Sequence, residues 1–118
     1  DLKKRFSVSA FDIGRSIGLL LDKILATKTG PGGAAPKVLL MCPPPVAKLT
    51  DFADMFEGAP EKSRQLPRYY QQHAELRGCR FFDAGTLIRC SDSDGIHFEP
   101  QEHQKLGERV AELVREIV

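Results

Sequence analysis

The chain has 118 residues, of which 42% are apolar and 28% charged, and its formal net charge at pH 7 is +1. These values suit a single globular domain, and the near balance of charge argues against nucleic acid or an anionic membrane as the main partner. No apolar run approaches the ~20 residues that a membrane-spanning helix needs.

The three cysteines, Cys42, Cys79 and Cys90, show no CxxC pairing. This pattern favours free thiols over a disulfide framework or a zinc site, and with them a cytoplasmic location. The first residue is Asp1 rather than Met, so the lack of a signal peptide carries little weight.

The first predicted helix runs from Ser9 to about Thr27, because Ser9 and Asp12 form a capping-box-like pair. Its apolar residues recur at helical spacing and give it one apolar face: Ile13, Ile17, Leu20, Leu21 and Ile24. A Gly- and Pro-rich segment, residues 29–36, ends the helix. The apolar run 38–42 then predicts a short strand buried on both faces, which the prolines at 43–45 stop.

A second helix is expected from about Pro60 to Arg77, with Gly78 as its left-handed end. Pro67 lies within this range, so either the helix begins near Leu66 with Pro67 in its first turn, or it is kinked there. His73 is expected to face solvent, as is His103 in the last helix. Residues 80–84 predict a second strand, and the last helix begins near Pro100 and buries Leu106, Val110, Leu113, Val114 and Ile117.

Alternating helices and strands predict parallel strands with helices on both faces of the sheet. Two short strands, however, cannot cover three amphipathic helices, and the first helix has no strand before it. We therefore expect residues 1–118 to be the carboxy-terminal portion of a larger α/β domain whose other strands lie upstream of Asp1.

The run of residues 93–98 places Asp94 three residues before His97 on a turn. A carboxylate in that position can fix the tautomer of an imidazole and stabilise its protonated form, so that His97 acts as a general base. Two other interpretations stay open: Asp94 only caps the turn while His97 is a surface residue, or Asp83 is the orienting acid. No serine lies in an obvious nucleophile turn.

Asp94-Gly95-Ile96-His97, followed by Phe98 and a helix, resembles the final DxxH block of the GDSL, or SGNH, hydrolases. Asp1-Leu2-Lys3 resembles the end of that family's GxND block. Three further segments are similar to its arylesterase and acyltransferase branch: residues 37–45, 56–63 and 81–85. The resemblance thus covers nearly the whole chain.

The resemblance implies a flavodoxin-like three-layer α/β/α sandwich of five parallel strands, to which this chain supplies the last two strands and three helices. It implies a Ser-His-Asp acyl transfer on small carboxylic esters with no cofactor, in which Asp94 orients His97. The serine, glycine and asparagine blocks are absent, so the missing amino-terminal portion of the domain is the required partner and the isolated chain is expected to be inactive.

Ligands of open α/β sheets bind beyond the carboxyl ends of the strands, where residues 43–56 and 85–97 form loops. Candidate substrate-pocket residues on these loops are Pro44, Phe52, Phe56 and Ile96. The aromatic residues of the first loop also suit packing within the domain or a subunit contact, so a homo-oligomer is a further hypothesis.

Two alternatives remain. One is a non-enzymatic flavodoxin-like binding module, which would bind flavin or a nucleotide without turning over esters. The other is a metal site built from Asp94, His97 and His103, but their spacing matches no familiar zinc pattern, so the sequence favours no metal.

Overall fold

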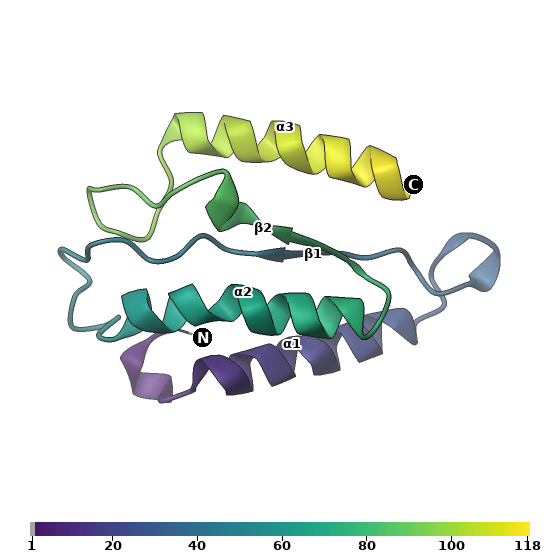
Figure 1. Ribbon diagram of the computed structural model, residues 1–118, viewed down its shortest axis with the longest axis horizontal. Helices are drawn as coiled ribbons and strands as arrows, with labels where there is room; N and C mark the ends of the chain where they lie inside the picture. Colours follow the sequence, from purple (N-terminus) through teal and green to yellow (C-terminus); the bar gives the residue numbers. More distant parts are fainter. Residues whose placement is uncertain (1) are drawn as a thin grey trace.

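The computed structural model describes residues 2–118 and has three layers (Figure 1). Helices α1 (Ala10–Leu25) and α2 (Ala59–Glu75) cover one face of a sheet made of β1 (Leu39–Cys42) and β2 (Arg80–Asp83). Helix α3 (Pro100–Ile117) lies on the other face. The predicted order of elements and the α/β class are confirmed. Asp1, which the resemblance assigns to a GxND block, lies outside the described residues.

The two strands pair in parallel, from Leu39 opposite Arg80 to Cys42 opposite Asp83. Both strands therefore end at the same edge, and the two loops that leave this edge face each other. Burial of β1 on both faces was predicted, but it is wrong for Met41, which is 39% exposed, while Cys42 is fully buried. Among the described residues the sheet has only two strands, so too little structure surrounds β1 to cover Met41.

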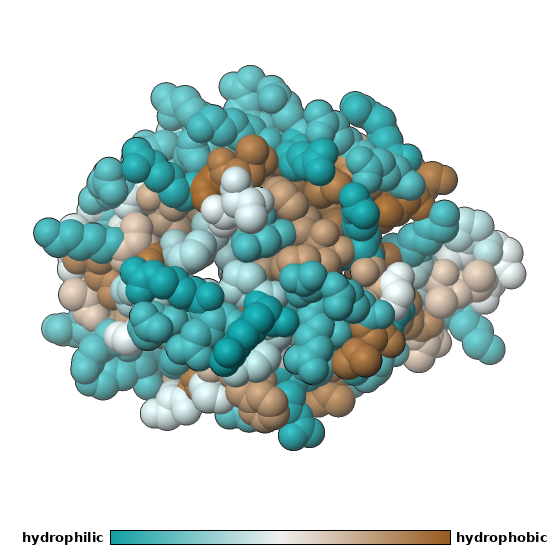
Figure 2. All heavy atoms as spheres, viewed as in Figure 1, coloured by the Kyte–Doolittle hydropathy of each residue, from teal (hydrophilic) through white to brown (hydrophobic). Residues whose placement is uncertain are grey.

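The start of α1 agrees with its sequence signal, since Ser9 Oγ accepts a hydrogen bond from the Asp12 N–H at 3.1 Å. Ile13 and Leu21 are buried as expected, but Leu20 and Ile24 are 54% and 42% exposed. Helix α2 covers only part of the apolar stripe of α1, and apolar side chains reach the surface elsewhere on the molecule too (Figure 2).

Two glycines one helical turn apart let α1 approach α2 closely. A Cβ at Gly14 would lie 2.5 Å from Tyr69 Cβ, and one at Gly18 would lie 2.7 Å from His73 Nδ1. His73 is therefore half-buried between the helices, and the expectation that it faces solvent is wrong. Nearby, Arg77 donates two hydrogen bonds to the Asp22 carboxylate, at 2.6 and 2.9 Å, which join the ends of the two helices.

Helix α2 is continuous from Ala59 to Glu75, so Pro67 lies in its interior and the predicted start near Leu66 is wrong. Proline in a helix interior costs ~3 kcal/mol. Leu66 and Tyr70, on either side of it, are 2% and 8% exposed, and their burial against the core offsets that cost. The predicted left-handed end at Gly78 is confirmed by its φ of 65°.

Helix α3 buries Leu113 fully, whereas Val114 is 38% exposed, contrary to prediction. Its sequence-predicted apolar face is otherwise half-buried, at Leu106, Val110 and Ile117. An ion pair between Arg80 Nη2 and Glu116 Oε2, 2.9 Å long, joins α3 to the start of β2. Within residues 2–118, none of the helices has the length and apolar character to cross a bilayer.

We predict that Gly14→Ala destabilises the fold by about 1–3 kcal/mol, because the new methyl group would overlap Tyr69 Cβ. The matched control is Gly107→Ala in α3, where a Cβ meets no atom within 4 Å; there the better helix propensity of alanine is expected to stabilise by about 0.5–1 kcal/mol. Urea unfolding of both variants measures the two effects. Equal stability of the Gly14→Ala variant and the wild type would contradict the close packing of α1 on α2.

Candidate catalytic site

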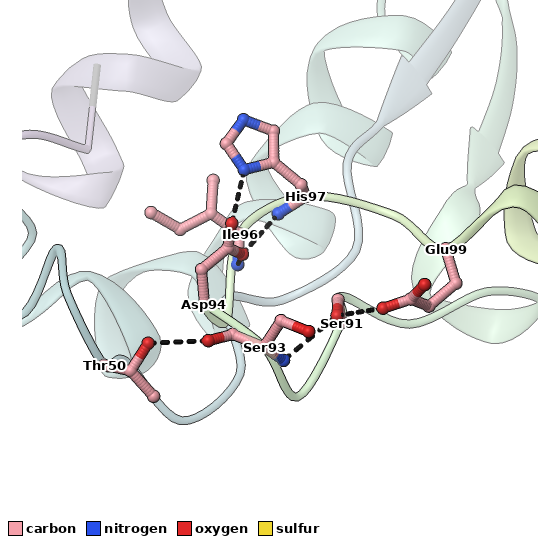
Figure 3. Close-up of polar contacts among 7 residues, drawn as sticks. All are labelled: Thr50, Ser91, Ser93, Asp94, Ile96, His97 and Glu99. Atoms are coloured by element: carbon pink, nitrogen blue, oxygen red, sulfur yellow. Dashed lines mark hydrogen bonds and ion pairs between the residues drawn. The ribbon is translucent and has the colours of Figure 1, made fainter.

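Asp94 and His97 lie on the segment between β2 and α3, near the loop that follows β1. Their side chains meet in a hydrogen bond of 2.6 Å between His97 Nδ1 and Asp94 Oδ2 (Figure 3). The Asp94 side chain is 20% exposed, whereas that of His97 is 72% exposed. The carboxylate is therefore held inside the turn while the imidazole projects from it.

The two oxygens of Asp94 have different partners. Oδ2 bonds the imidazole, and Oδ1 accepts the backbone N–H groups of Ile96 at 2.8 Å and of His97 at 2.9 Å. The His97 ring, and after it these two N–H groups, lower the pKa of Asp94 to about 2. Asp94 thus caps the turn and also bonds the imidazole, so capping does not exclude orientation of the histidine. The catalytic role of the pair stays a prediction.

An ionised carboxylate only accepts hydrogen bonds, so the ring nitrogen that faces Asp94 carries the proton. The neutral imidazole then has an unprotonated Nε2, which can accept a proton from a hydroxyl group. Phe52, from the loop after β1, lies against the ring edge to face, with centroids 6.3 Å apart. The site therefore has an oriented base beside an aromatic side chain.

The predicted pocket residues lie at different distances from this base. Phe52 contacts His97, and Phe56 packs on Phe52 with centroids 6.4 Å apart. Ile96 shares with His97 a shallow depression that Phe98 and His103 complete. Pro44 is buried beside Gly85 rather than in this depression. Their role in binding substrate stays a prediction.

Asp83, the alternative orienting acid, has another partner: its Oδ1 accepts the Gly85 N–H at 2.9 Å and caps the short 3-10 turn Ala84–Thr86.

Among the described residues, the remaining candidate groups near the site offer neither a reactive thiol nor a metal site. Burial raises the pKa of the Cys90 thiol, which keeps it protonated and unreactive. Residues 2–118 contain no group of three histidine, cysteine or acidic side chains suited to a metal ion. His103 is exposed and packs on Phe98, with centroids 5.2 Å apart.

Sequence reasoning missed the residues that hold this turn: Ser91, Glu99 and Thr50. Ser91 accepts a hydrogen bond from the Ser93 N–H at 3.0 Å and donates one to Glu99, and Thr50 Oγ1 donates to the Ser93 carbonyl at 2.7 Å (Figure 3). The serines before Asp94-Gly95 are a local turn signal that could have been recognised. The contacts of Glu99 and Thr50 depend on tertiary structure.

No family model matches the sequence, and no curated protein matches it significantly. Several solved structures match it closely. The native aryl esterase of M. smegmatis superimposes with a TM-score of 0.92 at 36% identity, and Est24, a carbohydrate acetylesterase from Sinorhizobium meliloti, with 0.93 at 34%. Each match covers 100% of this chain and 57% of the other, so the chain spans little more than half the length of these proteins.

We predict that the Asp94 carboxyl group stays ionised down to a pH of about 2, and that His97→Ala raises its pKa while leaving it below the ordinary value of 3.8, because both backbone N–H donors remain. Since the folded-state pKa is depressed, ionisation of Asp94 stabilises the fold above about pH 4, and this contribution is lost as the pH falls toward 2. Carboxyl carbon chemical shifts, followed by NMR against pH, measure both values. A midpoint near 3.8 in the wild type would contradict the network.

Proposed function

This chain belongs to the SGNH hydrolase family, and we propose that the protein of which it forms part hydrolyses small carboxylic esters by a Ser-His-Asp mechanism. The observation that carries the proposal is the 2.6 Å hydrogen bond between Asp94 and the otherwise exposed His97. It is supported by the similarity to an aryl esterase and a carbohydrate acetylesterase, each more than 30% identical over the whole chain.

In this mechanism His97 Nε2 takes the proton of a serine hydroxyl as the serine oxygen forms a bond to the ester carbonyl carbon. When the resulting tetrahedral intermediate collapses, the bond to the alcohol oxygen breaks and the imidazolium returns the proton to the leaving alcohol. His97 then removes a proton from water as the water oxygen bonds the acyl carbon. When this second intermediate collapses, the bond between the acyl carbon and the serine oxygen breaks, the imidazolium returns its proton to that oxygen, and the acid leaves. Asp94 keeps Nδ1 protonated throughout and stabilises each imidazolium by its negative charge.

In this proposal the nucleophilic serine, and the hydrogen-bond donors that stabilise the oxyanion, come from a part of the protein other than these 118 residues. The family's serine, glycine and asparagine blocks are absent here, and the chain spans 57% of the length of the two esterases. Exposed apolar side chains on α1 and β1, such as Leu20 and Met41, offer surface that further strands and helices of the same domain would bury.

The acyl group would bind beside Phe52, and Phe56 and Ile96 would also line its pocket. Pro44 is buried and would support the loop after β1 that carries Phe52. Acyl transfer to a second alcohol in place of water is part of the proposal, and it is supported by the resemblance of residues 37–45, 56–63 and 81–85 to the arylesterase and acyltransferase branch. The same machinery serves both outcomes, since either acceptor loses a proton to His97.

Two further properties are also proposals. A cytoplasmic location is supported by the cysteines, since Cys42, Cys79 and Cys90 are free thiols. Association of the protein with copies of itself is supported by the aromatic loop after β1, where Met55 is 49% exposed between Phe52 and Phe56.

We predict that Asp94→Asn or His97→Ala in the full-length protein lowers kcat for p-nitrophenyl acetate by about 10³- to 10⁴-fold, as expected when a triad loses its orienting acid or its base. The matched control is Asp92→Asn, which removes the same charge from an exposed position two residues earlier in the same turn and leaves kcat unchanged. Full activity in the Asp94→Asn variant would contradict the proposed roles.

The 118-residue chain alone is predicted to release p-nitrophenol no faster than free imidazole at equal concentration, because it lacks the serine block. Adding the upstream part of the domain, by co-expression, is expected to produce turnover. Turnover by the isolated chain well above the imidazole rate would show that its own residues supply the nucleophile, contrary to the proposal.

A further inference from the structure

The turn that carries Asp94 and His97 is closed by the side chain of Ser91. This residue is only 7% exposed. Its hydroxyl donates a hydrogen bond to Glu99 Oε1 and accepts one from the Ser93 N–H at 3.0 Å (Figure 3). The Ser91 side chain therefore links Ser93, before the catalytic pair, to Glu99, which follows it.

The backbone of Ser91 closes the turn a second time. Its N–H donates to the carbonyl of His97 at 2.7 Å, and its carbonyl accepts the N–H of Gly95 at 2.8 Å. Both bonds end on residues that flank or carry the catalytic pair, so the position of Ser91 sets the path of the chain from Asp94 to His97.

Glu99 fixes the far end of the same turn. Its carbonyl accepts the N–H groups of Glu102 at 2.9 Å and His103 at 3.2 Å, so it begins helix α3 while its side chain reaches back to Ser91. The rigid start of α3 is thereby coupled to the turn. The Glu99 side chain is exposed, and its hydrogen bond goes to Ser91 (Figure 3).

The loop after β1 holds the opposite side of the turn. Its Ala47 N–H donates to the Gly95 carbonyl at 2.9 Å, and a Cβ at Gly95 would lie 2.5 Å from the Lys48 carbonyl oxygen. Gly95 also has a φ of 81°, which favours glycine. This side is fixed by these backbone contacts and by the hydrogen bond from Thr50 Oγ1 to the Ser93 carbonyl, whereas the Ser91–Glu99 link is the side-chain contact that ties the turn to helix α3.

From these contacts we propose that Ser91 and Glu99 are positioning residues that hold the Asp94–His97 turn in the geometry needed for proton transfer. The expected effect on kcat rests on the proposed esterase function, whereas the expected effect on the geometry of the turn does not. Opening the turn moves the Ile96 and His97 N–H groups away from Asp94 Oδ1, which weakens the alignment of the carboxylate with the ring.

The kinetic test uses the full-length protein with p-nitrophenyl acetate as the probe. Ser91→Ala and Glu99→Ala are expected to lower kcat by about 10- to 100-fold with little change in KM, because a small misplacement of a base affects the transition state more than binding. Glu99→Gln keeps an oxygen that can accept the hydrogen bond from the Ser91 hydroxyl, so this variant is expected to retain most of the activity.

The matched control is Glu102→Ala. Glu102 also ties the start of α3 to the preceding loop, since its Oε2 accepts the Arg89 N–H at 3.0 Å, but it contacts neither Ser91 nor the catalytic pair. Its kcat is expected to stay within twofold of the wild type. Wild-type kcat in both Ser91→Ala and Glu99→Ala, or an equal loss in Glu102→Ala, would overturn the proposal. If Ser91→Ala fails to fold, comparison of kcat among Glu99→Ala, Glu99→Gln and Glu102→Ala still tests the positioning role.

A second readout separates this inference from the proposed function. Opening the turn is expected to raise the pKa of Asp94 in Ser91→Ala and Glu99→Ala, but not in Glu99→Gln or Glu102→Ala, as measured by NMR titration of the carboxyl carbon. If the wild-type protein hydrolyses no ester, the proposed function fails and this titration still decides the positioning role. An unchanged Asp94 pKa in both alanine variants would exclude that role.

Discussion

One hydrogen bond, from His97 Nδ1 to Asp94 Oδ2, gives this region of the molecule its chemistry. An exposed imidazole by itself exchanges freely between its two tautomers and rotates about its side-chain bonds. Contact with a carboxylate that remains charged assigns the proton to Nδ1 and leaves Nε2 free to accept one. The second oxygen of Asp94 is bound by backbone N–H groups, so the acid that orients the base is itself oriented by the turn.

The fold holds this turn in place from both sides of the sheet edge. Parallel pairing of β1 and β2 brings the loops after Cys42 and Asp83 together, and Gly95 lets their backbones approach. Farther from the site, the two glycines of α1 allow it to pack on α2, which buries Leu66 and Tyr70 against the sheet. The layers thus provide a rigid support, while the reactive ring stays exposed at its rim. This division between scaffold and loop is typical of α/β enzymes.

Local signals in the sequence were sufficient for the order of the elements and for the contact between Asp94 and His97. The Ser9 cap, the left-handed Gly78 and the Asp94-Gly95 turn each depend on a few neighbouring residues, and all three are found in the structure. Features set by tertiary contacts were not predictable. Pro67 is tolerated inside α2 because the flanking residues are buried, and His73 is half-buried because Gly18 lies opposite it. Glu99 gains its role only when α3 is placed next to Ser91.

The tautomer of His97 in the full-length protein is the most direct measurement of whether Asp94 prepares this residue as a base. Nitrogen-15 NMR of the histidine ring, at a pH where the ring is neutral, distinguishes a protonated Nδ1 from a protonated Nε2. The hydrogen bond to Asp94 predicts a proton on Nδ1 and a free Nε2, with the preference lost in Asp94→Ala. A proton on Nε2 in the wild type, or a tautomer ratio unaffected by the loss of Asp94, would contradict the role assigned to the pair.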